Sequence, residues 1–323
     1  MSNSNQLEMM ERIALDLEGV ERALASSFNT GSEDFNTLIR PLSEAGGKRL
    51  RAQLCLLIAN AGTSVEAERI KIAEALEMLH LATLIHDDVL DQAEIRRGEE
   101  TIHKHKGNKV AILSGDYLFA KAFRIVSEMP HMEYLKVFSH IITCLVEGEF
   151  MQMEDVYRID QGIDRYMTKT QKKTADFMEG CMELGGLLGG WSSDEIMYLK
   201  RYGHALGMAF QITDDIMDYR ETSDTTGKPV GNDLREGLLT YPLLSIVNES
   251  NQNQLLQDIK NLNHGGNEQE IIDYVIAQGG IDNTLRVAQQ YCDDALSALQ
   301  SIRDFDGKEF LVLAVQNLAD RKV

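Results

Sequence analysis

The stretch that decides the fold is residues 66–92, which read EAERIKIAEALEMLHLATLIHDDVLDQ. Apolar residues such as Ile70 and Ala73 recur in it at spacings of three and four, the spacing of one face of an α-helix. The same periodicity returns over residues 132–155 and 195–218, and strand-like alternation is nearly absent. The sequence therefore predicts an all-α protein of about ten helices or more.

Residues 1–323 are expected to form one domain. Only four prolines interrupt the chain, and its turn signals are short. Because no long low-complexity segment separates two halves, the sequence predicts a single large helical bundle around a central cavity.

The composition excludes several classes of protein. An apolar content of 43% excludes a disordered chain, and no apolar run approaches the ~18 residues of a membrane span. The 51 acidic and 32 basic side chains give a net charge of -19, which disfavours nucleic-acid binding. That charge should also repel small anionic substrates, unless cations bound to some of the acids reverse the sign of the charge locally.

The N-terminal residues and the cysteines favour a cytoplasmic protein. The first residues carry no basic patch followed by an apolar core, so we expect no signal peptide. The four cysteines lie far apart without CxxC spacing, which favours reduced cysteines in the core over a zinc site or disulfides.

Two acidic clusters repeat one pattern. Residues 87–91 read DDVLD and residues 214–218 read DDIMD, so both are DDxxD. The first and last acids of each cluster share one helix face, where like charges repel. Clusters made of carboxylates suit a hard cation, above all Mg²⁺. One such cluster alone could be the solvated acidic face of a helix. Two clusters, each preceded in the sequence by apolar residues, favour metal binding. The pair Asp293-Asp294 lacks the last acid, and we expect it on the surface.

Basic residues that suit a diphosphate lie around these clusters. Residues 46–51 read GGKRLR and place Lys48 and Arg51 at the start of a helix, where backbone N–H groups favour an anion. His80 lies seven residues before Asp87 and so shares its helix face. Further candidates follow along the chain: Arg96, Arg97, Lys173 and Lys228. Each alone could be an ordinary surface residue, and their order around two acidic clusters favours a binding role.

From about residue 46 to 244, and weakly beyond, these motifs resemble the trans-isoprenyl diphosphate synthases, the polyprenyl synthetase family. The motifs are GGKRLR, HLATLIHDDVLD, RRG, GDYLFAKAF, KT, FQITDDIMDY and GKPVGNDL, in the family's order. The resemblance implies the isoprenoid synthase fold and a prenyltransferase that joins isopentenyl diphosphate to an allylic diphosphate by ionisation, condensation and elimination. It is nearest to bacterial medium- and long-chain enzymes, including the catalytic small component of heptaprenyl diphosphate synthase.

The resemblance also implies a role for each residue. Those that would bind Mg²⁺, about three ions per site with substrate bound, are Asp87, Asp91 and Asp214, supported by Asp88, Asp215 and Asp218. Those that would hold the allylic diphosphate are Arg96, Lys173 and Lys228. Those that would bind isopentenyl diphosphate are Lys48, Arg51, His80 and Arg97. Thr174 and Gln211 would line the reacting centre, and Phe210 would pack near the homoallylic substrate.

Two small residues predict a long product. In the family, aromatic residues four and five positions before the first cluster restrict products to short chains, and these positions are Thr83 and Ala82 here. An open tunnel for the growing chain, and a product of roughly C30 to C40, are therefore expected. Met78, Leu79 and Phe138 could form the tunnel floor, and ordinary core packing is the alternative.

Several alternatives remain at this stage. A terpene cyclase would lack the second DDxxD and the GGKRLR and KT elements, and a non-catalytic subunit would be expected to lose its clusters. A short-chain C15 to C20 synthase, and a catalytic subunit that is inactive without a small regulatory partner, stay open. We expect farnesyl or geranylgeranyl diphosphate as primer, a homodimer or such a heterodimer, and a cytoplasmic enzyme. Loose membrane association for product release is left open.

Overall fold

A computed structural model describes residues 3–28, 33–44, 49–96, 98–220 and 231–319. These residues are almost entirely helical, with one two-residue hairpin, so the predicted all-α class is confirmed. The described chain divides into two units, and three of the boundaries between them fall within the helices α7 (Met132–Glu154), α9 (Asp176–Leu188) and α10 (Ser193–Arg220). The expected single domain stays a prediction.

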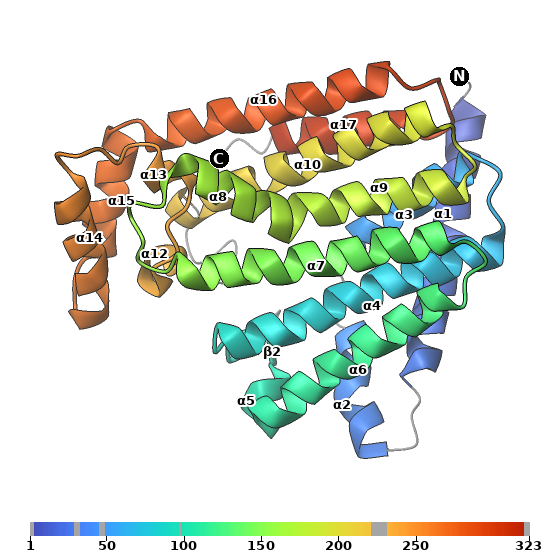
Figure 1. Cartoon of the computed structure of the whole chain (residues 1–323), viewed down its shortest axis with the longest axis horizontal. Coiled ribbons are helices and arrows are strands. Elements are labelled where there is room, and N and C mark those ends of the chain that lie inside the picture. Colours follow the sequence, from blue (N-terminus) through green and yellow to red (C-terminus); the bar gives the residue numbers. More distant parts are fainter. Residues whose placement is uncertain (1–2, 29–32, 45–48, 97, 221–230, 320–323) are drawn as a thin grey trace. The chain divides into compact units, whose positions relative to one another are not determined.

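The first unit comprises residues 1–139, 180–197 and 304–307. Its elements are α1 (Asn3–Ser27), α2 (Glu33–Glu44), α3 (Leu50–Asn60), α4 (Glu66–Leu90), β1 (Ile95–Arg96), β2 (Glu99–Glu100), α5 (Ile102–Lys106), α6 (Asn108–Ser127) and parts of α7, α9 and α10. Helix α4 packs against α1, α3 and α6, and Figure 1 shows α4 and α6 side by side.

Helix α4 is buried on several sides. Ile72, Leu76, Met78 and Leu79 are all 0% exposed, although they point in different directions around the helix. Burial of each such side chain contributes about 1.5–3 kcal/mol relative to an exposed one. The predicted helix over residues 66–92 is thus the core helix of the first unit, and it carries the first acidic cluster at its C-terminal end.

The second unit comprises residues 140–179, 198–303 and 308–323. Its elements are the rest of α7 (Met132–Glu154), α9 (Asp176–Leu188) and α10 (Ser193–Arg220), with α8 (Gly162–Thr170), the π-helix η1 (Gln171–Ala175), α12 (Asn232–Glu236), α13 (Tyr241–Leu244), α14 (Gln252–Asn261), the 3₁₀ helix η2 (Leu262–His264), α15 (Glu268–Ala277), α16 (Gly280–Gln300) and α17 (Lys308–Ala319). Met208, Ile212 and Ile216 on α10 enter its apolar core.

Local features mark the start of α10 and the junction between α8 and α9. At the start of α10, the Glu195 N–H donates to Ser192 Oγ, and the Ser192 N–H donates back to Glu195 Oε2, which forms a capping box. The chain from α8 into α9 is interrupted by η1, and a π-helical turn inside a helix often marks a functional site. Residues 173 and 174 lie in this turn.

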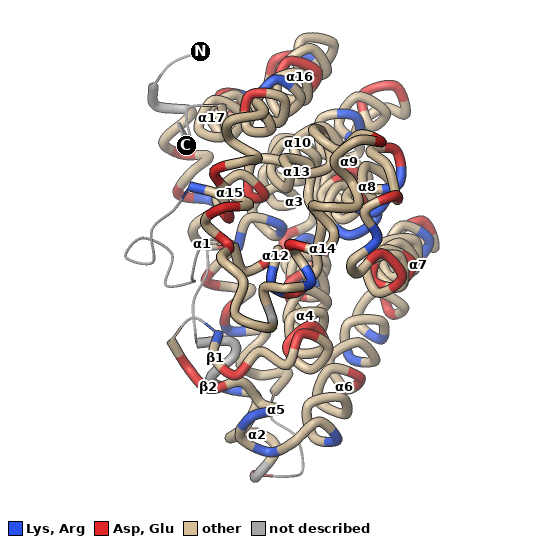
Figure 2. The backbone as a smooth tube through the Cα atoms, turned by 90° about the vertical axis from the view of Figure 1, so that its left-hand side faces the viewer, with Lys and Arg blue, Asp and Glu red and all other residues tan. Residues whose placement is uncertain are grey.

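The four cysteines lie where the sequence predicts, and the buried acids are paired. All four cysteines are buried and unpaired, which confirms the prediction of core cysteines. Figure 2 shows acidic and basic residues on the described helices. Among described residues, each buried acid has a hydrogen-bonding or ionic partner, as Asp16 has in Arg69 and Asp155 in Arg165. No helix in the described ranges is long and apolar enough to cross a membrane.

Candidate functional site

The first acidic cluster lies at the C-terminal end of α4. Asp87 is partly buried, Asp91 is exposed, and Asp88 between them is only 6% exposed. Asp91 caps the helix, and its N–H donates to the carbonyl of Asp87 at 2.8 Å. Carboxylates at this end face the negative pole of the helix dipole as well as one another. Positive charge near this end of the helix therefore stabilises the cluster.

The hairpin that follows α4 brings Arg96 back to this cluster. β1 and β2 pair Arg96 with Glu99 through a turn at Gly98, whose φ of 86° favours glycine. Arg96 Nε donates to Asp88 Oδ1 at 2.6 Å, and the Arg96 side chain remains 35% exposed. Arg96 thus lies at the first cluster, and its immediate partner there is the buried acid.

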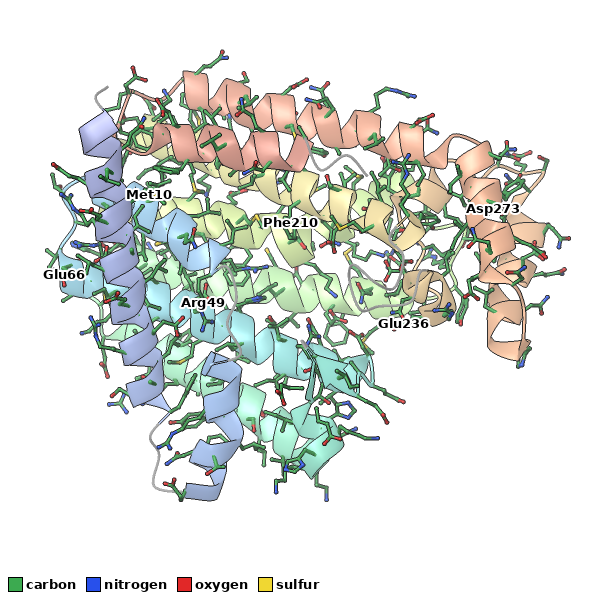
Figure 3. All side chains as sticks on the ribbon, turned by 180° about the vertical axis from the view of Figure 1, so that it is seen from behind. Met10, Arg49, Glu66, Phe210, Glu236 and Asp273 are labelled. Atoms are coloured by element: carbon green, nitrogen blue, oxygen red, sulfur yellow. The ribbon has the colours of Figure 1, made fainter. Side chains whose placement is uncertain are left out.

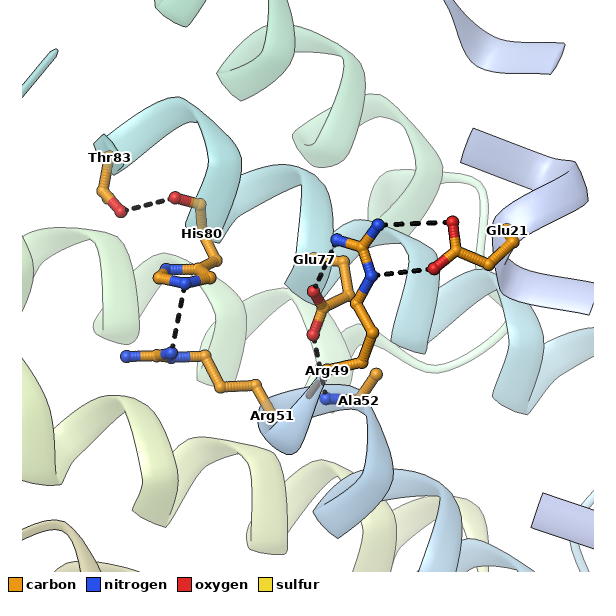
Figure 4. A network of polar contacts seen from close by, with 7 residues as sticks. All are labelled: Glu21, Arg49, Arg51, Ala52, Glu77, His80 and Thr83. Carbon is orange, nitrogen blue, oxygen red and sulfur yellow. Dashed lines mark hydrogen bonds and ion pairs between the residues drawn. The ribbon is translucent and has the colours of Figure 1, made fainter. Parts of the chain in front are cut away.

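Two of the expected isopentenyl diphosphate ligands lie together in the first unit. Arg51 Nη1 is 3.4 Å from His80 Nε2, as Figure 4 shows. Burial lowers the pKa of the Arg51 guanidinium, and the nearby Glu77 partly opposes that effect. Lys48, Arg97 and Lys228, which the sequence also assigns to diphosphate binding, lie outside the described residues.

The second acidic cluster lies in the last two turns of α10, and its middle acid is buried, as in the first cluster. Asp214 is exposed, Asp215 is 4% exposed, and Asp218 is partly buried. Tyr166 Oη donates to Asp215 Oδ2, and Gln211 Nε2 donates to Asp215 Oδ1 at 3.1 Å. Burial raises the pKa of Asp215 to about 6, although these hydrogen bonds partly offset the desolvation. The middle acid is therefore the buried one in each cluster.

Asp218 has a different environment from the other acids. Its Oδ1 accepts the Asn232 N–H at 2.9 Å and its Oδ2 accepts the Asp233 N–H at 3.2 Å. Its carbonyl accepts the Gly231 N–H at 2.9 Å. These backbone groups lie at the start of α12, so Asp218 fixes that segment. This agrees with a supporting role rather than a direct one at a cation.

Thr174 and Gln211 meet in the second unit. Thr174 Oγ1 donates to Gln211 Oε1 at 3.0 Å, so a chain of hydrogen bonds runs from Thr174 through Gln211 to Asp215. Phe210 precedes Gln211 on α10 and is partly buried (Figure 3). The structure thus joins three residues that the sequence assigned separately.

Lys173 has protein partners in this structure. Its Nζ lies 2.5 Å from Glu149 Oε2 and 3.1 Å from Gln152 Oε1, both on α7, and its side chain is 25% exposed. A diphosphate bound by Lys173 would compete with these partners or share the ammonium with them. The assignment of Lys173 to substrate stays a prediction.

Four residues near these groups escaped the sequence analysis. Tyr166 and the buried Lys169 precede Lys173 by seven and four residues, so helical spacing could have placed them on its face. Burial lowers the pKa of Lys169, and the nearby Asp155 and Asp215 oppose that effect. Arg49 lies within GGKRLR and Glu77 lies three residues before His80, but nothing in the sequence indicates that the two form an ion pair.

The residues assigned to chain length are buried in α4. Ala82 is 0% exposed, and Thr83 is partly buried with its hydroxyl donating to the His80 carbonyl at 2.8 Å. Met78, Leu79 and Phe138 are also 0% exposed. Burial agrees with a tunnel wall and equally with ordinary core packing, so the tunnel stays a prediction.

The donor set of the acidic clusters fits a hard divalent cation. The accessible acids Asp87, Asp91 and Asp214 offer carboxylate oxygens, which Mg²⁺ prefers as ligands. They lie near the C-terminal ends of helices, where positive charge is favourable.

Other acidic groups in the second unit have different surroundings. Two of them include softer donors: His140, Cys144 and Asp176, and Asp176, Glu179 and His204. Lys200 Nζ lies 3.4 Å from Glu179 and His204 Nδ1 lies 3.6 Å from it, so that carboxylate already has partners. The look-alike acids Asp293 and Asp294 are exposed and accept hydrogen bonds from glutamines of their own helix.

The close approach of α10 to η1 gives a testable prediction. A Cβ at Gly207 would lie 2.6 Å from Ala175 Cα, next to Thr174. Gly207→Ala should therefore push the two elements apart, lower the free energy of unfolding by about 1–3 kcal/mol, and weaken the Thr174–Gln211 contact. Thermal unfolding and turnover should both fall. Wild-type turnover in a folded variant would contradict a catalytic role for this contact.

Helical units that carry two DDxxD clusters and cationic side chains define a class: all-α, metal-dependent enzymes that act on diphosphates. Comparison with known proteins identifies the family within this class. The polyprenyl synthetase family profile matches residues 32–278, and the chain therefore belongs to the polyprenyl synthetase family. Its predicted prenyltransferase activity is confirmed at the level of this family.

Three similar proteins span nearly the whole chain. Octaprenyl diphosphate synthase of Escherichia coli is 33% identical over 312 residues, 95% of this chain and 96% of that protein. Heptaprenyl diphosphate synthase component 2 of Geobacillus stearothermophilus is 33% identical over 288 residues, 89% and 90% of the two chains. The crystal structure of a polyprenyl synthase from Caulobacter crescentus, complexed with calcium and isoprenyl diphosphate, matches with a TM-score of 0.87 and 30% identity, covering 100% of this chain and 98% of that one.

Proposed function

We propose that this chain is a Mg²⁺-dependent synthase that extends farnesyl or geranylgeranyl diphosphate with isopentenyl diphosphate to a trans-polyprenyl diphosphate of roughly C30 to C40. Membership of the polyprenyl synthetase family supports the reaction. The names of the relatives, heptaprenyl and octaprenyl diphosphate synthase, denote seven and eight isoprene units and support the length.

The accessible acids Asp87, Asp91 and Asp214 would hold magnesium, and Asp88, Asp215 and Asp218 would support them. Bound Mg²⁺ supplies positive charge that stabilises a leaving diphosphate. In each cluster the middle acid would act through its neighbours: Asp88 orients Arg96, and Asp215 accepts from Tyr166 and Gln211. The calcium ion in the Caulobacter enzyme supports a divalent cation here.

The basic side chains would divide between two diphosphates. Arg96, Lys173 and Lys228 would bind the allylic diphosphate and stabilise the charge that grows as its C–O bond breaks. Lys48, Arg51, His80 and Arg97 would bind isopentenyl diphosphate, whose double bond attacks the allylic cation.

The remaining steps need orientation and a dry site. Thr174 and Gln211 would line the reacting carbons, with Phe210 beside the homoallylic chain. We assign removal of the proton to the departing diphosphate. The apolar residues of α4 and α10 would exclude water, which would otherwise convert the cation to an alcohol.

One observation carries this proposal: both DDxxD clusters end long helices, with an accessible first acid and a buried, hydrogen-bonded second acid. Carboxylates in this arrangement suit bound divalent cations. It also resolves the conflict posed by the net charge of -19, because six of the 51 acids would then attract diphosphate rather than repel it.

The test is to incubate the purified chain with Mg²⁺, labelled isopentenyl diphosphate and farnesyl diphosphate, and to size the dephosphorylated products. A series ending between C30 and C40 is expected. A series ending at C15 to C20 would instead identify a short-chain synthase.

The second candidate is a catalytic subunit that is inactive without a small regulatory partner. The relative named component 2 supports it. A folded chain that makes no product alone and gains activity with such a partner would establish this function.

We also propose how the chain assembles and where it is located. Helix α6 exposes Ile112, Leu113 and Phe123, at 44%, 65% and 42%, which supports an apolar contact in a homodimer. We place the enzyme in the cytoplasm, with loose membrane association at product release, and treat the chain as a single polyprenyl synthetase domain.

A further inference from the structure

Arg49 lies in a network that joins three helices of the first unit. Its Nε and Nη2 donate to the two carboxylate oxygens of Glu21 on α1, at 2.8 and 3.2 Å. Its Nη1 donates to Glu77 Oε2 on α4 at 3.2 Å. Figure 4 shows the guanidinium held between these two carboxylates at the beginning of α3. Arg49 thus fixes the start of α3 against both neighbouring helices.

This arrangement is costly in two ways. Arg49 has φ 44° and ψ 38°, a left-handed conformation that non-glycine residues rarely adopt. Its side chain is 9% exposed and that of Glu77 is 2% exposed, so the ion pair is desolvated. A desolvated ion pair adds little to the free energy of unfolding, because a well-packed apolar pair in its place often stabilises the fold as much. A role in geometry explains these costs better than a role in stability.

Glu77 connects the network to the expected diphosphate ligands. Its second oxygen, Oε1, accepts the Ala52 N–H in the first turn of α3 at 3.2 Å. Arg51 lies between Arg49 and Ala52 in this turn. His80 lies one helical turn after Glu77 on α4. The Glu77 carboxylate therefore sets the spacing between the elements that carry Arg51 and His80, whose side chains are 3.4 Å apart.

We propose that Arg49 and Glu77 are positioning residues for the isopentenyl diphosphate site, which hold Arg51 and His80 at the separation that binds one diphosphate. This inference rests on the proposed function. Neither residue touches the substrate. Their loss should weaken binding of isopentenyl diphosphate and leave binding of the allylic substrate unchanged.

The test measures KM for each substrate separately. In Arg49→Met, KM for isopentenyl diphosphate should rise about tenfold or more, with KM for farnesyl diphosphate changed less than about twofold. Arg49→Met leaves the buried Glu77 carboxylate without this ionic partner, which is destabilising in itself. The double variant Arg49→Met/Glu77→Gln therefore removes both charges together. Its glutamine can still accept from Ala52, and the same selective rise in KM is expected. Arg49→Lys, which keeps the charge, should recover part of the affinity.

A second buried ion pair in the same unit provides the matched control. Arg69 on α4 donates to both oxygens of Asp16 on α1, at 2.6 and 3.0 Å, and Asp16 also accepts from Asn60 at the end of α3. Arg69→Met/Asp16→Asn therefore loosens the same three helices away from Arg51 and His80. It should lower Tm and leave both KM values within about twofold of wild type.

The outcomes separate the two hypotheses. Equal changes in both KM values, or the same KM pattern in the control pair, would overturn the positioning role, as would unchanged KM values in the folded Arg49 variants. If the wild-type chain and its reconstituted complex do not consume isopentenyl diphosphate, the proposed function itself fails.

Discussion

Asp87→Ala is expected to lower turnover by about three orders of magnitude or more, because it removes an accessible carboxylate from a cluster that would bind the catalytic cation. The fold should survive. Asp87 and Asp91 are four residues apart at the negative end of α4, so removing one charge relieves repulsion. Steady-state turnover and thermal unfolding, measured on the same preparation, check both parts of the prediction.

Two variants sharpen that result. Asp293→Ala removes an exposed acid from the look-alike pair on α16 and should leave turnover at the wild-type level. Asp88→Asn should cost less turnover than Asp87→Ala, since Asp88 is buried and its carboxylate contacts Arg96. Near-normal turnover in folded Asp87→Ala would remove the first cluster from the catalytic machinery.

Ala82→Phe is expected to shorten the product from roughly C30 to C40 to about C15 to C20. Ala82 is 0% exposed one turn before the first acidic cluster, where a phenyl ring would block a tunnel that leads away from the metals. Product sizing by chromatography of the dephosphorylated alcohols checks the prediction. Unchanged product length in a folded variant would refute the tunnel assignment.

Ala73→Phe is the matched control for this variant. Ala73 is also 0% exposed on α4 but lies nine residues earlier, on the opposite face of the helix. Overpacking there should destabilise the protein by about 1–3 kcal/mol and leave product length unchanged. If a phenyl ring proves too large at either site, Ala82→Leu and Ala73→Leu form a milder pair.

The helices could be predicted from the sequence because their signal is local. Periodicity over residues 66–92 corresponds to α4 at Glu66–Leu90, and periodicity over 195–218 corresponds to α10 at Ser193–Arg220. The small differences arise where caps and adjoining turns set the ends, such as the Ser192 capping box. The acidic clusters were equally visible, since DDxxD is a short pattern along one chain segment.

The contacts that organise the clusters could not be predicted in the same way. Tyr166 is 49 residues from Asp215, and Arg49 is 28 residues from both Glu21 and Glu77. Such pairs depend on how helices pack, and the sequence of either partner alone carries no sign of the other. The left-handed backbone at Arg49 could not be predicted either, because local preference disfavours it for a residue other than glycine.

The most direct measurement is the rate at which the wild-type enzyme incorporates labelled isopentenyl diphosphate as free Mg²⁺ is raised from zero in excess chelator. No incorporation is expected in the chelator, followed by full recovery as Mg²⁺ is added, with far-UV circular dichroism unchanged throughout. Asp87→Ala and Asp214→Ala should recover little activity even at high Mg²⁺. Elongation at the wild-type rate in the chelator would contradict catalysis by cations bound at the two acidic clusters.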